Sequence, residues 1–428
     1  MHKKLAVVWL VIVVLVVGAA AQQAPRAVVI RAGRLLDVKT GKLLADQTII
    51  IAGERIVSLG GVAPAGAQVI DLPSATVLPG MIDVHTHLTM DPEDVGLRSL
   101  TIAVPRQALK GAKNARATLL AGFTTVRNVG AEGYSDVALR DAINASDVPG
   151  PRMLVSGPAL GITGGHCDNN LLPASYHASG DGVADGVAAV QHKVRENIKY
   201  GADLIKMCAT GGVMSRGDDP QHSQYTMEEL KAIVADAHRL GRRVAAHAHG
   251  AEGIRWASEA GVDSIEHGSY LDEAGIAVLK KNGTYLVPTL GLEDWLLENM
   301  DKIHLPEYAR QKARTIFPIA QKNLARAFAS GVKIALGTDA AVFPHGLNAR
   351  ELVIYVKLGM TPIDALRTTT LNAADLLGWS DRVGSIEPGK YADIIAVDGD
   401  PLSDVTTLQR MKFVMKGGTV YKNEFADK

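Results

Sequence analysis

The fold of this chain is indicated first by the stretch Val77-Leu78-Pro79-Gly80-Met81-Ile82-Asp83-Val84-His85-Thr86-His87. It has the pattern of a short apolar β-strand that ends in two histidines. Side chains alternate between the two faces of a strand, so His85 and His87 point to the same side. By itself such a pair is a weak signal, because surface and core histidines account for most pairs of this spacing.

This strand is the first of eight that alternate with amphipathic helical stretches between Val77 and about Gly378. The predicted strands are residues 76–84, 124–129, 152–156, 204–207, 243–246, 264–266, 285–288 and 333–336. Alternating strands and helices are typical of βα units, and eight of them predict an α/β fold, a (β/α)₈ TIM barrel. A doubly wound open sheet is the alternative, but no Gly-rich phosphate loop stands where that fold would need one.

The two ends of the chain have a different pattern. Short β segments punctuated by Gly and Pro fill residues 27–75, and similar segments return near the C-terminus. We predict that residues 27–76 and 379–428 together build a small β-sandwich domain. Residues 77–378 would then form the (β/α)₈ barrel.

Composition excludes some classes of partner. The 428 residues suffice for a sizeable core, and 45 Lys and Arg balance 45 Asp and Glu, so the formal net charge is zero. This balance removes the electrostatic argument for nucleic acid as a partner. A small-molecule substrate is expected instead, and a homo-oligomer is left open.

The N-terminus has the features of a signal peptide. Lys3 and Lys4 precede an apolar run that ends in Ala19-Ala20-Ala21, an A-x-A cleavage pattern. We predict removal of residues 1–21, which gives a periplasmic or secreted protein without a stable membrane span. An uncleaved anchor is the alternative, but the run is slightly short for a span.

Polar side chains stand at the C-terminal ends of several predicted strands. Besides the pair on the first strand these are Lys206, His247 and His267, and Asp339 follows the eighth strand. Barrel enzymes place their chemistry at this face. Neutral imidazole and carboxylate groups are ligands for zinc and similar divalent ions. Four histidines and one aspartate from four strands therefore predict a metal centre.

The chain resembles the amidohydrolase superfamily over essentially all of its mature length. Residues 77–87 resemble that family's first-strand motif, 337–339 its eighth-strand aspartate motif, and 387–393 its C-terminal return to the small sheet. Residues 122–127, 244–250 and 264–268 resemble the imidazolonepropionase-related branch. Within this branch the chain is most similar to prolidase-like (Xaa-Pro and Xaa-Arg/Lys) carboxypeptidases and ochratoxin-hydrolysing amidohydrolases.

The resemblance implies two divalent metal ions, with zinc as the expected metal. His85, His87 and Asp339 would bind the more buried ion, and His247 and His267 the more exposed one. Lys206 matches a lysine that CO₂ converts to N6-carboxylysine, a carbamate that bridges both metals. An ammonium cannot bind a cation, whereas a carbamate is an anion. A metal-bridging hydroxide would attack the scissile carbonyl, with Asp339 as the catalytic proton carrier.

Candidate substrate residues lie on the loops that follow the strands. His166 and Tyr225 match substrate-side positions of the prolidase-like group, where the tyrosine is directed toward a substrate carboxylate. Arg216 is a candidate to pair with the same carboxylate, although a solvated loop charge explains it equally well. His249 shares a strand end with His247, and spacing does not decide which of them binds metal. The motif favours His247 and leaves His249 for the substrate.

The predicted function is cleavage of the amide bond to a C-terminal amino acid in dipeptides or N-acyl amino acids, ochratoxin-type amides included. One alternative is a mononuclear cyclic-amide hydrolase or deaminase. Another, outside enzymes, is a periplasmic metal-binding protein without turnover. The acyl group, the leaving amino acid and the native metal are left open.

The two cysteines, Cys167 and Cys208, are expected to be free thiols. Neighbouring strands are about 4.8 Å apart, so the two could lie near one another in an oxidising compartment. Cys208, however, shares the inward parity of Lys206 and has the properties of a small buried residue.

Overall fold

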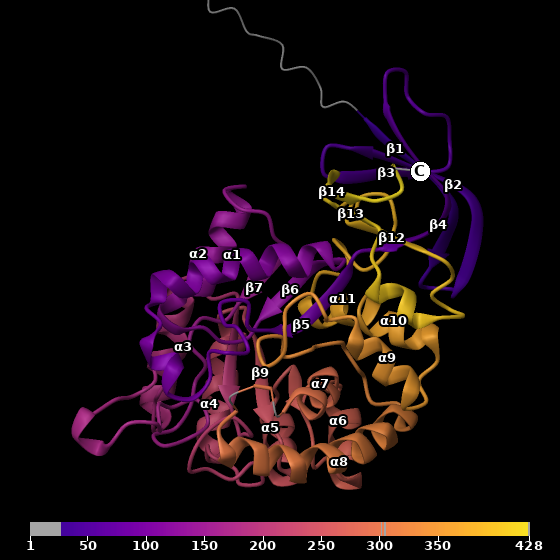
Figure 1. The fold of residues 1–428 in the computed structure, drawn as a ribbon. Helices are drawn as coiled ribbons and strands as arrows, with labels where there is room; N and C mark the ends of the chain where they lie inside the picture. The colour runs from indigo at the N-terminus through magenta and orange to yellow at the C-terminus, as the bar shows by residue number, and fades with distance from the viewer. Residues whose placement is uncertain (1–26, 301, 304, 427–428) are drawn as a thin grey trace, which may run out of the picture.

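The computed structural model describes residues 27–300, 302–303 and 305–426, so the predicted signal peptide lies outside it. Its strands form three sheets, and helices cover the two that are parallel (Figure 1). Within the described part of the chain, no helix has the length and apolar character needed to cross a membrane.

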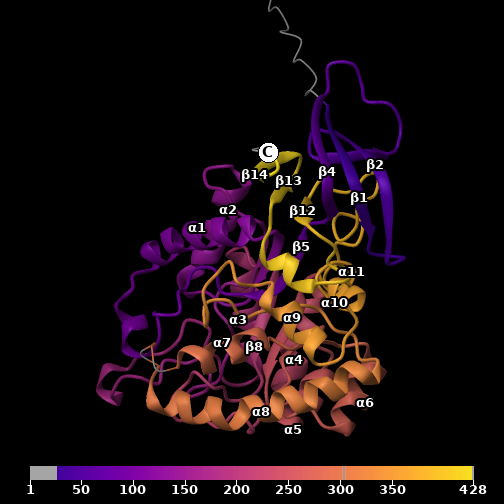
Figure 2. The same ribbon diagram turned by 45° about the vertical axis from the view of Figure 1, so that its right-hand side comes forward.

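One sheet combines strands from both ends of the chain, and Figures 1 and 2 show its indigo and yellow strands together at one end of the molecule. In spatial order its strands are β14 (Thr419–Asn423), β13 (Phe413–Lys416), β12 (Ile394–Asp398), β4 (Gln68–Pro79), β1 (Val28–Asp37), β2 (Lys42–Ala52) and β3 (Arg55–Leu59). Central β4 pairs parallel with β1 and antiparallel with β12. The predicted union of the terminal segments therefore takes the form of one seven-stranded sheet. A sandwich of two sheets is not confirmed, and the predicted domain boundaries stay predictions.

Two parallel sheets occupy the middle of the chain. The first contains β5 (Met81–Thr86), β6 (Phe123–Asn128) and β7 (Arg152–Val155), and the second contains β8 (Leu204–Cys208), β9 (Arg243–Ala248), β10 (Ser264–His267) and β11 (Tyr285–Val287). Nearly all of their side chains are buried, the pattern of parallel strands covered on both faces. Six of the eight predicted strands are thus present within about two residues of their predicted bounds, whereas the first, residues 76–84, spans the end of β4 and most of β5.

The eighth predicted strand, residues 333–336, is not a regular strand. It carries a single parallel bridge, from Ile334 to Leu286 of β11. A second bridge joins Ala340 to Thr86 of β5, and a third joins Leu160, just past β7, to Met207 of β8. Single bridges therefore link the edges of the two parallel sheets.

The helices follow the strands as the alternation predicts. They are α1 (Val104–Leu120), α2 (Ser135–Asn144), α3 (Val187–Lys199), α4 (Met227–Arg239), α5 (Ala251–Ala260), α6 (Glu273–Asn282), α7 (Gly291–Asn299), α8 (Glu307–Ser330), α9 (Arg350–Lys357), α10 (Pro362–Thr368) and α11 (Leu371–Leu377). Short 3₁₀ turns lie at η1 (Gly96–Thr101), η2 (Glu132–Tyr134), η3 (Ala174–Tyr176) and η4 (Val405–Gln409). Apolar helix faces pack on the parallel strands to form the largest core cluster, which includes Leu230, Ile254 and Leu279.

Candidate metal centre

The predicted ligands meet in one pocket at the C-terminal ends of the parallel strands. Its volume is about 550 Å³, and its lining includes all six predicted metal-site residues together with His166, Arg216 and His249. The predicted residues lie far apart in sequence. Parallel strands bring them together because their carboxyl ends share one edge of the fold.

The first ligand group consists of His85, His87 and Asp339. Nε2 of His85 lies 3.5 Å and Nε2 of His87 lies 3.2 Å from Oδ1 of Asp339. Burial alone would raise the pKa of Asp339, but hydrogen bonds from the two imidazoles outweigh it and hold this pKa far below its usual range. Asp339 is therefore a carboxylate at any working pH, as a metal ligand must be.

A buried charge network orients His85. Nδ1 of His85 is 2.7 Å from Oε2 of Glu266, and Arg127 donates to the other oxygen of Glu266 at 2.8 Å. Burial would raise the pKa of Glu266, but Arg127 and His85 together lower it to about 2. The carboxylate thus accepts the Nδ1–H of His85, and Nε2, which faces Asp339, is the nitrogen that a metal would use, as in many metal-binding histidines.

Asp83 fixes the segment that carries Asp339. Its carboxyl accepts from the Thr338 hydroxyl at 2.6 Å, from the Asn348 amide at 2.7 Å and from the Thr338 backbone at 3.1 Å. The next residue, Asp339, has φ 58°, a left-handed conformation that is uncommon outside glycine but is adopted more readily by Asp than by most residues. Burial raises the pKa of Asp83 to about 6.

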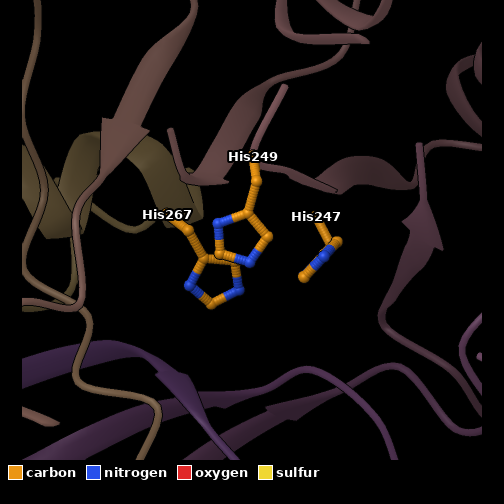
Figure 3. Close-up of side chains that lie close together, drawn as sticks. All are labelled: His247, His249 and His267. Atoms are coloured by element: carbon orange, nitrogen blue, oxygen red, sulfur yellow. The ribbon is translucent and has the colours of Figure 1, made fainter. Parts of the chain in front are cut away.

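The second group consists of His247, His249 and His267. One ring nitrogen from each lies within 4.8 Å of the others, and all three side chains are buried. Figure 3 shows the rings of His249 and His267 stacked face to face, with the ring of His247 beside them. A ligand set of His85, His267 and Asp339 meets the same 4.8 Å limit, so the two groups adjoin at His267.

These imidazoles are neutral. Burial lowers the pKa of His249 to about 3 and holds the pKa values of His247 and His267 well below the usual range for histidine. Only neutral imidazole has a nitrogen lone pair to donate to a metal. His249 therefore has the position and protonation of a ligand as much as His247 has, and the structure leaves the choice between them open.

Lys206 lies on β8 in the wall of the same pocket and is buried. Burial lowers the pKa of its amine to about 8, although the carboxylates of Glu266 and Asp339 oppose this shift. With this pKa, roughly a tenth of the amine is uncharged at pH 7, far more than for an exposed lysine.

Of the predicted substrate residues, some line the pocket and one does not. His166 stacks on His247 with 4.1 Å between ring centroids, and Arg216 lines the pocket. Tyr225 does not line it: this side chain is buried in the core, and its hydroxyl donates to the carbonyl of Ala184 at 3.3 Å. That position gives no support to the predicted contact with a substrate carboxylate, because the hydroxyl is buried and already bonded to a backbone carbonyl.

The expectation of two free thiols is wrong. Cys167 and Cys208 form a disulfide, with 6.2 Å between their Cα atoms. The loop after β7 runs beside β8, where the backbone of Leu160 bonds to Lys206 and Cys208 at 2.8 Å each. The neighbouring strand ends therefore bring the cysteines within disulfide reach, and the bond ties the residue after His166 to β8.

Two functional residues, Arg127 and Glu266, escaped the sequence analysis as individual side chains. The available signal was a charged residue inside an otherwise apolar strand, which must have a buried partner.

Glu293, on helix α7, is a further buried carboxyl group. It lies beside the apolar pocket residues Leu292 and Leu296. Its Oε2 has no hydrogen-bond partner among the described residues. Burial and the nearby Glu351 raise its pKa well above normal.

Comparisons with known proteins identify the family and several relatives. The model of the amidohydrolase family matches residues 76–421. The chain is 34% identical over 414 residues to ochratoxinase of Aspergillus niger, covering 89% of this chain and 84% of the relative. It is 25% identical over 394 residues to imidazolonepropionase of Micrococcus luteus, covering 84% and 89%. A crystal structure of a Xaa-Pro dipeptidase with bound methionine in the active site superposes with a TM-score of 0.88 at 38% identity, covering 93% of this chain and 100% of that one.

The disulfide should be measurable and stabilising. Titration of the unfolded, unreduced protein is expected to find no reactive thiol. Replacing both cysteines by Ala should lower the free energy of unfolding by about 2–4 kcal/mol, because the bond closes a long loop in the unfolded chain. Wild type unfolded after reduction is the control and should titrate as two thiols. Two thiols without reduction would contradict the bond.

Glu293→Gln should be more stable than the wild type, and this difference should grow as pH rises. A carboxyl whose folded pKa is raised contributes most below its unfolded pKa, near 4.5, and loses that contribution as pH rises through its folded pKa. Gln does not titrate and has no such loss. In urea denaturation, the free energy of unfolding of the variant should therefore exceed that of the wild type by more at pH 8 than at pH 5. Glu298→Gln, exposed on the same helix, is the control. Equal pH dependence in wild type and Glu293→Gln would refute the assignment.

Proposed function

Because the chain belongs to the amidohydrolase family, we propose that it uses two divalent metal ions to hydrolyse the amide bond to a C-terminal amino acid in dipeptides or N-acyl amino acids, ochratoxin-type amides included. Family membership makes the chain a hydrolase of amide or peptide C–N bonds. The observation that carries the finer proposal is the pair of adjoining ligand groups in one pocket.

The donor atoms fit metal ions in detail. In His85 and His267 the Nδ1 atom is engaged by Glu266 or Thr289, at 2.7 and 2.8 Å. In His247 it is instead Nε2 that faces an oxygen, the carbonyl of Gly211 at 3.1 Å. Each of these three rings therefore has one nitrogen paired with an oxygen of the scaffold, and the other nitrogen of His85 faces Asp339, its proposed partner in metal binding, at 3.5 Å. His85, His87 and Asp339 would hold one ion, and His247 and His267 the other, with His249 beside them.

Lys206 is proposed to complete the site as a carbamate. Its neutral amine adds to CO₂, a C–N bond forms, and one proton is released to water. The lowered pKa of this buried lysine supplies the uncharged amine that the addition needs. The product carries two oxygens in place of a cation, and its negative charge balances part of the metal charge.

When bound, the ions polarise the scissile carbonyl and lower the pKa of the attacking water. Side chains of this protein carry out the proton transfer and bind the substrate. Asp339, ionised and in contact with both first-strand histidines, accepts the proton of the water and passes it to the leaving nitrogen. Arg216, in the pocket wall, pairs with the carboxylate of the substrate's C-terminal residue. A substrate with a free C-terminal carboxylate is consistent with the dipeptidase among the solved relatives.

The other candidate functions have less support. A metal-binding protein without turnover does not fit membership of a hydrolase family. A mononuclear cyclic-amide hydrolase or deaminase would match the imidazolonepropionase relatives, but their identity to this chain is lower than that of ochratoxinase. It would also leave the buried Lys206 in the pocket without a task.

We propose two further features on the same basis. The parallel sheets, linked edge to edge by single bridges at Leu160, Ile334 and Ala340, would form one (β/α)₈ barrel, as in the family. The protein would be exported to the periplasm or beyond after loss of residues 1–21. The Cys167–Cys208 disulfide supports export, because such bonds persist in oxidising compartments.

Substrates with a free C-terminal carboxylate should be preferred. Amidation of that carboxylate, or Arg216→Gln, should each lower kcat/KM roughly ten- to hundredfold, since a charge-assisted hydrogen bond contributes about 1.5–3 kcal/mol. The two changes together should cost no more than the larger one alone. Arg106→Gln, exposed on α1, is the control. Equal rates on free and amidated dipeptides would instead support a cyclic-amide substrate.

Purified enzyme should contain close to two divalent ions per chain. Lys206→Ala should reduce the content toward one, because its carbamate is the proposed bridge, and added short carboxylic acids with metal should restore part of the activity. Lys199→Ala, at the exposed end of α3, should keep both ions. Elemental analysis decides the matter, and a fully active enzyme with one ion rules out the binuclear site.

A further inference from the structure

A second cavity lies at the opposite ends of the parallel strands from the metal centre. Its volume is about 440 Å³, and none of the described residues that line it also lines the metal pocket. The lining includes the first residues of β7 and Asp203, which comes just before β8. It also includes Tyr391, which leads into β12 of the seven-stranded sheet. The cavity is thus a separate feature at the amino-terminal ends of these strands.

One wall of this cavity has a surplus of negative charge. Arg140 of α2 donates to Asp141 at 2.9 Å and to Asp203 at 2.7 Å. One guanidinium therefore faces two carboxylates, and the group of three is negative overall. Oδ1 of Asp141 and Oδ2 of Asp203 accept these bonds, whereas the second oxygen of each carboxylate has no hydrogen-bond partner among the described residues. This wall can therefore accept hydrogen bonds from a cation.

The turn after α11 supplies the opposite charge. Arg382 lines the cavity with a side chain that is 49% exposed, and its only charged partner among the described residues is its neighbour Asp381, at 3.9 Å. That separation is too long for a hydrogen bond. The third arginine of the lining, Arg152, is instead held by Asp393 at 2.9 and 3.2 Å. Arg382 is therefore the guanidinium that this cavity leaves available to an anion.

Two aromatic residues also line the cavity, and one of them is left for a ligand. The ring of Tyr391 is covered by two guanidinium groups, those of Arg55 and Arg152, at 3.6 and 3.5 Å from its centroid. Trp379 has a guanidinium near it only at 5.4 Å, that of Arg382. A flat ring can therefore pack on Trp379 while an anionic group attached to it reaches Arg382.

We infer that this cavity binds a zwitterionic amino acid with an aromatic side chain. The carboxylate of the ligand pairs with Arg382, its ammonium group with Asp141 and Asp203, and its ring packs on Trp379. A ligand with one charge or none would leave one of the charged walls without a partner. The inference does not rest on the proposed function, although an amino acid is also a product of the reaction proposed above.

The test is ¹⁹F NMR of the zinc-loaded enzyme, labelled with 5-fluorotryptophan and titrated with L-phenylalanine. The Trp379 signal, assigned by its loss in Trp379→Phe, should shift saturably. Trp256 on α5 lines neither cavity and should not respond. Trp295 on α7 is next to Leu296 of the metal pocket and reports binding there. The two sites are therefore observed separately.

Arg382→Gln should weaken the binding seen at the Trp379 signal roughly ten- to hundredfold, because a charge-assisted hydrogen bond is lost. Arg382→Lys, which keeps the charge, should restore part of the affinity. Arg106→Gln, exposed on α1, is the control and should bind as wild type does. Two further probes test the need for both charges. These are 3-phenylpropanoate, which lacks the ammonium group, and 2-phenylethylamine, which lacks the carboxylate, and each should bind at least roughly tenfold more weakly than L-phenylalanine.

Three results would overturn the inference, whichever amide the enzyme hydrolyses. The first is a Trp379 signal that does not shift, or an affinity that is unchanged in Arg382→Gln. The second is a response of the Trp295 signal alone, which would mean that the amino acid binds only in the metal pocket. The third is equal affinity for L-phenylalanine and 3-phenylpropanoate, which would exclude a site built for a zwitterion.

Discussion

The carboxylate of Glu266 is the constraint on which the metal site depends. It is fully buried, and a buried charge is tolerated only when it is paired and hydrogen-bonded. Arg127 on β6 and His85 on β5 meet that need, so one side chain of β10 ties three strands together. The pairing also sets the ring orientation of His85. The hydrogen bond from His85 that helps to offset the cost of burying Glu266 thus also orients His85.

The same principle recurs around the pocket. Each ring nitrogen that faces the scaffold is matched with an oxygen: Glu266 for His85, Thr289 for His267 and Ser269 for His249. The remaining nitrogens are left to the pocket. Because burial keeps the rings neutral, the cluster has lone pairs where it would otherwise have mutually repelling cations. The scaffold therefore prepares the site for metal before any metal binds.

The loops over the pocket are secured by stronger means than their own packing. The Cys167–Cys208 disulfide fixes the loop that carries His166 to β8, and Lys312 fixes the loop that carries Arg216 to α8. Both anchors lie directly behind residues assigned to the substrate. Loops that shape a binding site are usually the mobile part of a barrel enzyme. Here covalent and ionic ties limit that freedom.

Sequence alone determined much of this protein. The alternation of apolar strands and helices located most of the parallel strands, and positions at predicted strand ends placed His85, His87, Lys206, His247 and His267 at one edge. Those features are periodic and local, so they can be read from the chain. It did not determine that the eighth segment makes only a single bridge, or that the terminal strands form one continuous sheet.

The partners of each polar group were decided by the tertiary structure. Tyr225 had the motif of a substrate residue, yet its hydroxyl is occupied by a core carbonyl. The inward-facing position of Cys208 on its strand indicated a free buried thiol, yet the loop after β7 brings Cys167 close enough to form a disulfide with it. Glu266 gained its importance from a residue 139 positions away along the chain. Periodicity specifies the face on which a side chain lies. It does not specify which distant group will be there to take its hydrogen bond, because that depends on how the packed elements meet.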